Sequence, residues 1–193
     1  AYLPMVSALA KKGYHVIYCN SRYRGVDSAL IMAKMVLDLN ACIKDAKARW
    51  GYEKVVLAGW SGGGSLSLFF QSQAEKPTVE FTPAGDSPDL TRAGLEPAQG
   101  MMLLAAHISR AGTLTEWMDA SILDENDPYK RDRSLDIYDP EQTEKPPYSA
   151  AFVQRYREAQ IARNRKITAW VKQRLEDFRK KGMLYEEFAF VTH

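Results

Sequence analysis

The stretch that most constrains the fold is residues 54–71, which read KVVLAGWSGGGSLSLFFQ. Residues 55–58 are apolar and rich in β-branched side chains, with no polar alternation, which is typical of a strand buried on both faces of a parallel sheet. After Gly62, apolar residues up to Phe70 supply one side of a helix that can pack on that sheet. The stretch therefore predicts a strand, a tight turn and a helix in direct succession.

The turn itself matches the pattern G-x-S-x-G through Gly59, Ser61 and Gly63. A strand that turns directly into a helix forces its apex residue into a sparsely populated backbone conformation. We expect both glycines to be needed because a Cβ there would obstruct the close passage of strand and helix. The Ser61 hydroxyl then stands clear at the carboxyl edge of the sheet, and the N–H of Gly62 points to where an oxyanion would form. Ser61 is the candidate nucleophile and Gly62 a candidate oxyanion donor.

Other glycine-rich turns of this kind bind phosphates. The dinucleotide pattern G-x-G-x-x-G would need glycine at position 61, and a Walker A loop would need a Lys-Ser/Thr pair after its last glycine. Neither pattern is present. A merely structural turn remains the other interpretation, and the flanking strand and helix favour the nucleophile over it.

Composition bounds the class of protein. The 193 residues are 46% hydrophobic, enough for one ordinary domain, and the net charge of +2 gives no general case for binding nucleic acid or a membrane surface. No stretch approaches the about 20 consecutive apolar residues that a membrane-spanning helix needs. Cys19 and Cys42 form neither a disulfide framework nor a metal-ligand spacing, so we expect two reduced, partly buried thiols.

The first part of the chain alternates between helix and strand patterns. We expect a helix over residues 2–12, a strand over 15–19, a polar loop over 20–25 and a helix from Asp27 or Ser28 to Trp50. Gly13 and Gly51 are placed to end the two helices. This alternation with short links predicts right-handed crossovers onto a parallel sheet.

The later part of the chain has a different texture. Residues 75–100 contain too many Pro and Gly for a regular element, 101–106 form a predicted buried strand, and 109–147 are polar, with short helical turns and no regular sheet expected. A long helix is predicted over 149–181, with an apolar side and a basic side. We interpret the basic side as a solvated face with acidic partners in the preceding stretch, in preference to a site for an anionic surface or partner. The acidic run 124–127 is not a calcium loop, because it lacks the required glycine and terminal glutamate.

The chain resembles the α/β-hydrolase superfamily through GWSGG at residues 59–63 and through the loop NSRYRG at 20–25, which is similar to an arginine-glycine loop of those enzymes. The runs TPAGDSPDLTRAGLEPAQG, MMLLAAH and WMDASILDENDP look like a poorly characterised bacterial branch. The resemblance implies an α/β class with a partial α/β-hydrolase fold, a mostly parallel sheet and helices on both faces. It implies a core over residues 1–107, a largely helical cap-like insertion over 108–186 and the start of a further core strand over 187–193.

The same resemblance implies that parts of the site lie elsewhere. The family sheet has about eight strands, with the nucleophile after the fifth, so we expect this chain to be an internal fragment that is nearly inactive alone. The loop that donates the second oxyanion hydrogen bond is expected before residue 1, and the catalytic histidine and acid beyond residue 193.

Three histidines within the chain compete for the role of base. His15 begins a predicted strand, at the end opposite the active edge, so we discount it. His107 ends the strand next to the nucleophile, and a pocket-lining or structural role fits it better. His193 follows the order Ser, Asp, His, with Asp119 or Asp124 as a formal acid, but it ends what we expect to be an unfinished strand. The base and the acid stay unassigned.

The function expected from these features is a serine hydrolase that acts on small carboxylic-ester-like substrates, with no cofactor and no metal. An amide, thioester or C–C bond stays open as the target. The alternative is a non-catalytic binding protein that keeps the turn as architecture. We expect a cytoplasmic protein with no nucleic-acid partner and no membrane span, and its oligomeric state is open.

Overall fold

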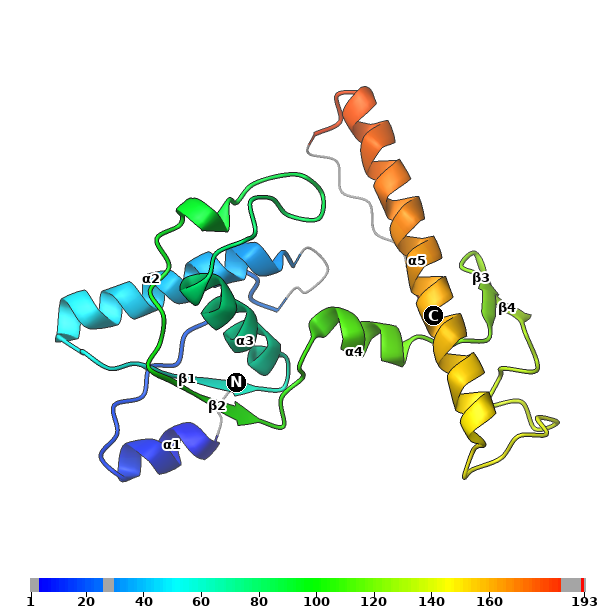
Figure 1. Cartoon of the computed structure of the whole chain (residues 1–193), viewed down its shortest axis with the longest axis horizontal. Helices are drawn as coiled ribbons and strands as arrows, with labels where there is room; N and C mark the ends of the chain where they lie inside the picture. Colours follow the sequence, from blue (N-terminus) through cyan, green and yellow to red (C-terminus); the bar gives the residue numbers. More distant parts are fainter. Residues whose placement is uncertain (1–3, 26–29, 185–191, 193) are drawn as a thin grey trace. The chain divides into compact units, whose positions relative to one another are not determined.

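The computed structural model describes residues 4–25, 30–184 and 192. The chain divides into two compact units, Ala1–Ala106 and His107–His193, which are treated separately below. The boundary predicted from the sequence falls one residue later. In chain order the elements are α1 (Pro4–Lys11), α2 (Met32–Trp50), β1 (Val56–Trp60), α3 (Gly62–Glu75), η1 (Leu90–Arg92), β2 (Gly100–Leu104), α4 (Arg110–Trp117), β3 (Ile122–Asp124), β4 (Asp127–Arg131) and α5 (Ala150–Lys180) (Figure 1).

The first unit is built on the parallel pair β1 and β2. Val56 is paired with Gly100 and Trp60 with Leu104, so the two strands end level with each other. The connection between them passes through α3, as a parallel crossover requires. The unit is therefore mixed α/β, and the sequence correctly predicts its two strands and their parallel direction.

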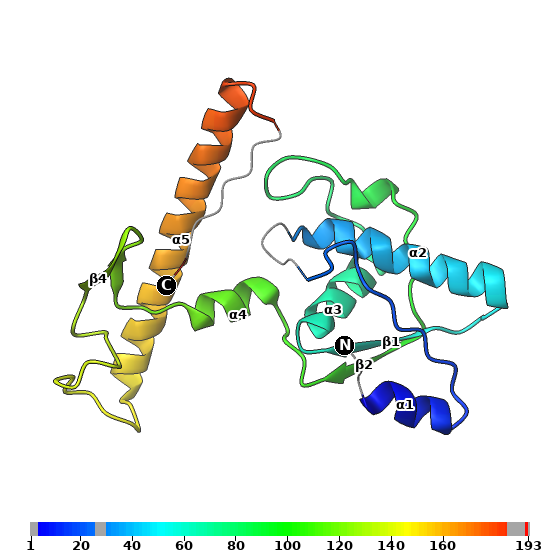
Figure 2. The ribbon, with the colours of Figure 1, turned by 180° about the vertical axis from the view of Figure 1, so that it is seen from behind.

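The core of this unit lies on one face of the two strands. Helices α2 and α3 lie on the same side of β1 and β2 in both views (Figures 1 and 2). Val36 of α2 and Phe70 of α3 are fully buried, and Leu57 of β1 is 6% exposed. Leu90 of η1 closes the cluster, at 1% exposure. These side chains hold α2, α3, β1 and η1 together because each element presents its apolar side to the same interior.

The other face of β1 is open, which corrects the prediction of a strand buried on both faces. Val56 is 54% exposed and Trp60 is 57% exposed, while the alternate residues Leu57 and Gly59 are buried. The described helices bury only the face toward α2 and α3, since α1 has no buried residue. The prediction of β2 as a buried strand is also wrong, because the consecutive residues 101–103 are all exposed and so both faces of this strand are open.

The helix ends follow the glycine signals. The chain turns after α1 at Gly13, whose φ is +88°. At the end of α2, Gly51 has a φ of +67° and its N–H donates to the carbonyl of Lys47. Both residues lie in the left-handed region, which only glycine adopts without a steric cost. Both predicted helix ends are thus confirmed, whereas α2 begins at Met32, and the predicted start at residues 27–28 lies outside the described residues.

The predicted strand over residues 15–19 is wrong, since the structure has no strand there. Ile17 and Tyr18 are exposed. Side-chain contacts hold this part of the chain, with the Tyr52 hydroxyl 2.6 Å from Nδ1 of His15 and the Arg22 guanidinium on Asp38. A β-branched run favours a strand only where a neighbouring strand can pair with it.

Residues between α3 and β2 are irregular apart from η1, as expected from their prolines and glycines. Buried polar side chains accept hydrogen bonds from the backbone N–H groups of this irregular segment. Oε1 of Gln73 accepts from the N–H groups of Thr78 and Val79, at 2.9 and 3.0 Å. Oδ1 of Asn40 accepts from the N–H of Glu96 at 3.0 Å. These bonds replace the regular ladders that the segment cannot form.

The second unit is organised on α5. This helix begins after Ser149, whose Oγ accepts from the N–H of Phe152 at 3.2 Å, so the long predicted helix is confirmed with an N-cap at its first turn. Phe152 and Ile167 are buried along it. Nε2 of Gln160 donates to the carbonyls of Glu116 and Met118 at 2.7 and 2.8 Å, which ties α5 to the end of α4.

A hairpin formed by β3 and β4 contradicts the expectation of no regular sheet in this region. Asp124 pairs with Asp127 across its turn, and Oδ1 of Asp124 accepts from the N–H of Asn126 at 3.1 Å. The sequence pattern missed the hairpin because β3 has only three residues, too few to show an alternation. The acidic run acts as the turn, since Asp and Asn side chains readily hydrogen-bond the backbone two residues on.

The basic side of α5 finds partners in the preceding acidic stretch. Arg163 is buried, with its side chain 4% exposed, and makes two hydrogen bonds to the Glu125 carboxylate at 2.7 and 2.6 Å. Its Nη1 also donates to the carbonyl of Asp119 at 2.7 Å. Among the helices within the described ranges, none is both long enough and apolar enough to cross a bilayer. The predicted final strand lies outside the described residues.

Candidate functional site

Ser61 lies at the junction between β1 and α3 with a φ of 52° and a ψ of −122°. Apart from glycine, Ser61 and Ala105 alone have a positive φ in the described part of the chain. Such a backbone costs a residue with a Cβ on the order of 1–3 kcal/mol, and surrounding structure must hold it in place. The predicted strained apex is confirmed.

The neighbouring strand holds this apex. The N–H of Ser61 donates to the carbonyl of Leu104, the last residue of β2, at 3.1 Å. Its own carbonyl accepts from the N–H of Gly64 at 3.0 Å, within the first turn of α3. Both backbone groups of Ser61 are therefore engaged, so the residue keeps its strained conformation at the carboxyl edge of the sheet.

Gly59 and Gly63 of the motif differ in whether the fold tolerates a Cβ at their position. A Cβ at Gly59 would lie 2.6 Å from the carbonyl oxygen of Gly63 and 2.7 Å from Cα of Gly64. No atom lies within 4 Å of a Cβ at Gly63. Close passage of β1 and α3 thus requires glycine at position 59, and the expectation that Gly63 is equally required is wrong. The crossing point of strand and helix lies at Gly59 itself.

The Ser61 side chain and the Gly62 N–H have no hydrogen-bond partner among the described residues. The Ser61 side chain makes no capping hydrogen bond to α3, and within residues 4–25, 30–184 and 192 no acceptor engages the N–H of Gly62. Both residues are partly exposed. A helix N-terminus leaves its first N–H groups unsatisfied and carries a partial positive charge. A hydroxyl beside such groups can attack an electrophile whose developing negative charge the N–H would accept.

Ala105 is a second strained position that the sequence does not reveal. Its φ is +42°, and it directly follows Leu104, which accepts the Ser61 N–H. Nothing in an Ala-Ala pair signals a positive φ, since alanine has no preference for that region. Gln71 is also unforeseen. It exchanges two 3.0 Å hydrogen bonds with the backbone of Ala98 and so guides the chain into β2.

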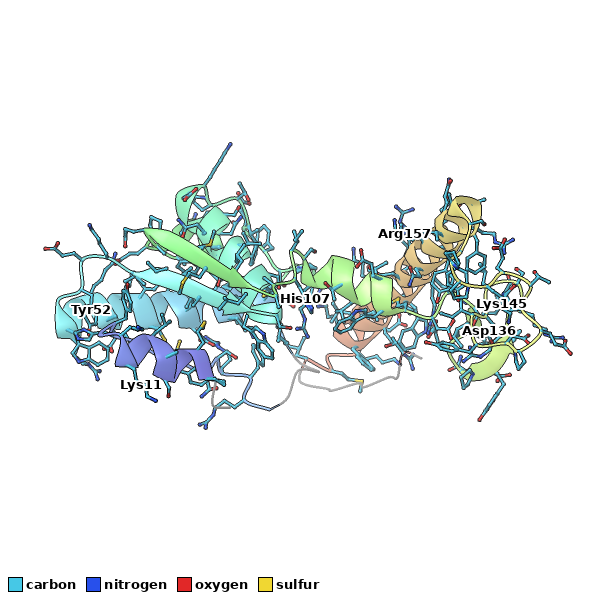
Figure 3. All side chains as sticks on the ribbon, turned by 90° about the horizontal axis from the view of Figure 1, so that it is seen from below. Lys11, Tyr52, His107, Asp136, Lys145 and Arg157 are labelled. Carbon is cyan, nitrogen blue, oxygen red and sulfur yellow. The ribbon has the colours of Figure 1, made fainter. Side chains whose placement is uncertain are left out.

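The three histidines of the chain lie at residues 15, 107 and 193. His15 bonds Tyr52, and Figure 3 places Tyr52 beside the amino end of β1, away from the carboxyl end that carries Ser61. His107 belongs to the second unit, where its ring meets Trp117 edge-on with centroids 5.6 Å apart. His193 lies outside the described residues. Within the first unit, no described histidine is placed to take a proton from Ser61.

The two formal acids have structural partners. Asp119 accepts from Ser121 Oγ at 2.7 Å and from Nη1 of Arg131 at 2.7 Å. Burial raises the pKa of Asp119, but the Ser121 hydrogen bonds and the Arg131 charge outweigh burial and hold this pKa below its ordinary value. Asp124 caps the hairpin turn and lies 3.7 Å from Nζ of Lys130. Both carboxylates are used within the second unit to shape the β3–β4 region.

No family model, curated protein or solved structure matches this chain. The described residues contain no group of three or more His, Cys, Asp or Glu side chains that could hold a metal ion.

Proposed function

We propose that the chain carries the nucleophile of a serine hydrolase with an α/β-hydrolase type of core, acting on small carboxylic-ester-like substrates. One observation carries the proposal, namely the positive φ of Ser61 at the strand-to-helix junction that follows β1. A sharp, strained turn that exposes a serine hydroxyl above a parallel sheet is the geometry on which G-x-S-x-G nucleophiles depend. The requirement for glycine at position 59 supports the same interpretation.

In the proposed reaction, Oγ of Ser61 attacks the ester carbonyl and the N–H of Gly62 donates to the oxyanion that forms. A single oxyanion donor is worth about 10²–10³ in rate. A histidine takes the proton of Ser61 and delivers it to the leaving alcohol, which yields an acyl-enzyme that water then hydrolyses. No cofactor is required. The second oxyanion donor, the histidine and its acid are proposed to come from residues other than those described in the first unit.

The test is labelling of the natural protein that carries this sequence with a fluorescent fluorophosphonate, which bonds covalently to activated serines. We expect labelling of the wild type and none of Ser61→Ala. Ser109→Ala is the matched control, because Ser109 is an ordinary N-cap whose Oγ accepts from the N–H of Gly112. Labelling that persists in Ser61→Ala would refute Ser61 as the nucleophile.

The alternative of a non-catalytic binding protein predicts a different result. It is favoured by the lack of a described histidine near Ser61 in the first unit. In that case the folded wild type would fail to react with the fluorophosphonate and would not hydrolyse p-nitrophenyl esters. A positive label followed by a series of esters with increasing acyl length would define the substrate class.

A further inference from the structure

Residues 14–22 form a segment of the first unit that runs antiparallel to α2. At one end of the segment, Nδ1 of His15 lies 2.6 Å from the hydroxyl of Tyr52, which follows α2. At the other end, Arg22 contacts Asp38 in the first half of α2. The segment and the helix therefore run in opposite directions. Residues between His15 and Arg22 lie beside the part of the chain between Tyr52 and Asp38, in reverse order.

The Arg22 anchor is specific. The backbone N–H of Arg22 donates to Oδ2 of Asp38 at 2.9 Å, and its guanidinium donates to Oδ1 at 2.6 Å. The Arg22 hydrogen bond holds the pKa of Asp38 below its ordinary value, so the carboxylate is ionised at neutral pH. The backbone N–H and the guanidinium of Arg22 thus both donate to the Asp38 carboxylate. A shift of the segment along α2 would break both hydrogen bonds.

This alignment brings the two cysteines together. Cys42 lies four residues after Asp38, one turn or about 6 Å further along the same side of α2. Cys19 precedes Arg22 by three residues, which span at most about 10 Å of chain and so cover that turn. The Cys42 side chain lies close enough to the Cys19 thiol to raise its pKa. Both thiols are free, with Cys19 exposed and Cys42 partly exposed, so a small reagent can reach the pair.

We propose that Cys19 and Cys42 are a site of reversible disulfide formation that fastens residues 14–22 to α2. The oxidant is a low-molecular-weight disulfide of the glutathione type. One cysteine thiolate attacks it, forms a mixed disulfide and releases one small thiol. The other cysteine then attacks the mixed disulfide, closes the Cys19–Cys42 bond and releases the second small thiol. Two protein thiols are oxidised and one small disulfide is reduced to two thiols, so atoms and electrons balance.

The reduced state is the resting state of the pair. Partial desolvation of the thiol group and the nearby Cys42 side chain raise the pKa of Cys19 to about 12, so its thiolate is scarce at neutral pH although a small reagent can reach the residue. Attack of this thiol on the small disulfide is accordingly slow, and the bond does not form where no such disulfide is present. A metal site is the less suitable role, because no third ligand of the described residues joins the two thiols.

The test uses the full chain of 193 residues, whose only cysteines are these two. Reduced protein is incubated with oxidised glutathione and digested with trypsin without reduction. We expect peptide 13–22 covalently joined to peptide 35–44, together with the loss of two hydrogens from the intact mass. Because the fold holds the sulfurs together, we expect the equilibrium yield of the bond to be at least about tenfold higher in the native chain than in the same chain in urea.

Variants locate the cause. Asp38→Asn removes the charge that grips Arg22, and we expect it to lower the yield of the disulfide several-fold, with helical content checked by circular dichroism. Asp45→Asn is the matched control, because Asp45 lies on the same helix and forms an ion pair with exposed Arg49. Equal yields in native and unfolded chains would overturn the proposal, as would two glutathione adducts without a cross-link. Equal yields in the two variants would overturn the alignment by Arg22.

Discussion

The N–H of Ser61 donates to the carbonyl of Leu104 at 3.1 Å, across the carboxyl ends of two parallel strands. The bond joins the apex of the strand-to-helix turn to the last residue of β2, and Ala105, the next residue, is itself strained. Two sparsely populated backbone conformations thus lie next to each other at one edge of the sheet. Strain of this kind persists only where the surrounding structure over-determines it, and it gathers at functional sites.

The Gly59 contact predicts opposite effects for two similar substitutions. Gly59→Ala places a Cβ 2.6 Å from the Gly63 carbonyl oxygen, and we expect it to lower the free energy of unfolding by about 2–3 kcal/mol. Gly63→Ala meets no atom within 4 Å and lies inside α3. It should raise the free energy of unfolding by about 0.5–1 kcal/mol through helix propensity. Urea unfolding followed by circular dichroism measures both, and equal effects would contradict the crossing point.

Strain at Ser61 predicts a trade between stability and activity. Ser61→Gly relieves the positive φ and should stabilise the folded chain by about 1 kcal/mol, because glycine adopts this region freely. Ser61→Ala keeps the Cβ and should leave the free energy of unfolding within about 0.5 kcal/mol of the wild type. Both should abolish fluorophosphonate labelling. Thermal melts of the three proteins test the prediction, and a destabilised Ser61→Gly would show that the turn is not strained.

The ion pair between buried Arg163 of α5 and partly buried Glu125 should contribute strongly to the stability of the second unit. Arg163→Met removes the charge that faces Glu125 and leaves that carboxylate, 20% exposed, without its bidentate partner. We expect a loss of about 3 kcal/mol in the free energy of unfolding, since breaking a buried pair strands one charge. Arg165→Ala, on the exposed side of the same helix, should change it by no more than about 0.5 kcal/mol. Similar urea midpoints for the two variants would refute the assignment.

The Asp119 site predicts a dependence on pH. Its pKa is lower in the folded chain than in the unfolded chain, where it is about 3.9. The Asp119 contribution to stability is therefore fully present above about pH 4 and is lost as the pH falls through the folded pKa. Asp119→Asn should cost about 2 kcal/mol at neutral pH and flatten the loss of stability in acid.

Urea midpoints of wild type and Asp119→Asn across the acidic range provide the measurement. Glu176→Gln, at an exposed position on α5, is the control and should follow the wild-type profile. Parallel profiles for wild type and Asp119→Asn would contradict a coupled Asp119–Arg131 pair.

Features that depend on local sterics could be predicted from the sequence. Gly13 and Gly51 indicated two turns with positive φ, and the glycines around Ser61 indicated a strained apex. Each is decided by what a residue's own backbone can adopt or what its side chain can bond within one turn. For the same reason, the candidate nucleophile was the part of the site that the sequence located.

Features that depend on distant partners could not be predicted in this way. Residues 15–19 have strand-like side chains, yet Tyr52 and Asp38 hold the flanking residues against the α2 region, and no strand forms. The G-x-S-x-G pattern does not distinguish Gly63 from Gly59, and only the crossing point of β1 and α3 shows that position 59 alone excludes a Cβ. The hairpin β3–β4 is too short to leave an alternation in the sequence.

The order of strand, turn and helix around Ser61 and the extent of α5 follow from residue patterns alone. The covered face of β1, the hydrogen bond from the Ser61 N–H to Leu104 and the alignment of residues 14–22 along α2 become visible only in the folded chain. The two kinds of feature differ in how far along the chain their causes act. Backbone sterics and helix periodicity act over a few residues, whereas burial and pairing depend on which segments meet in space.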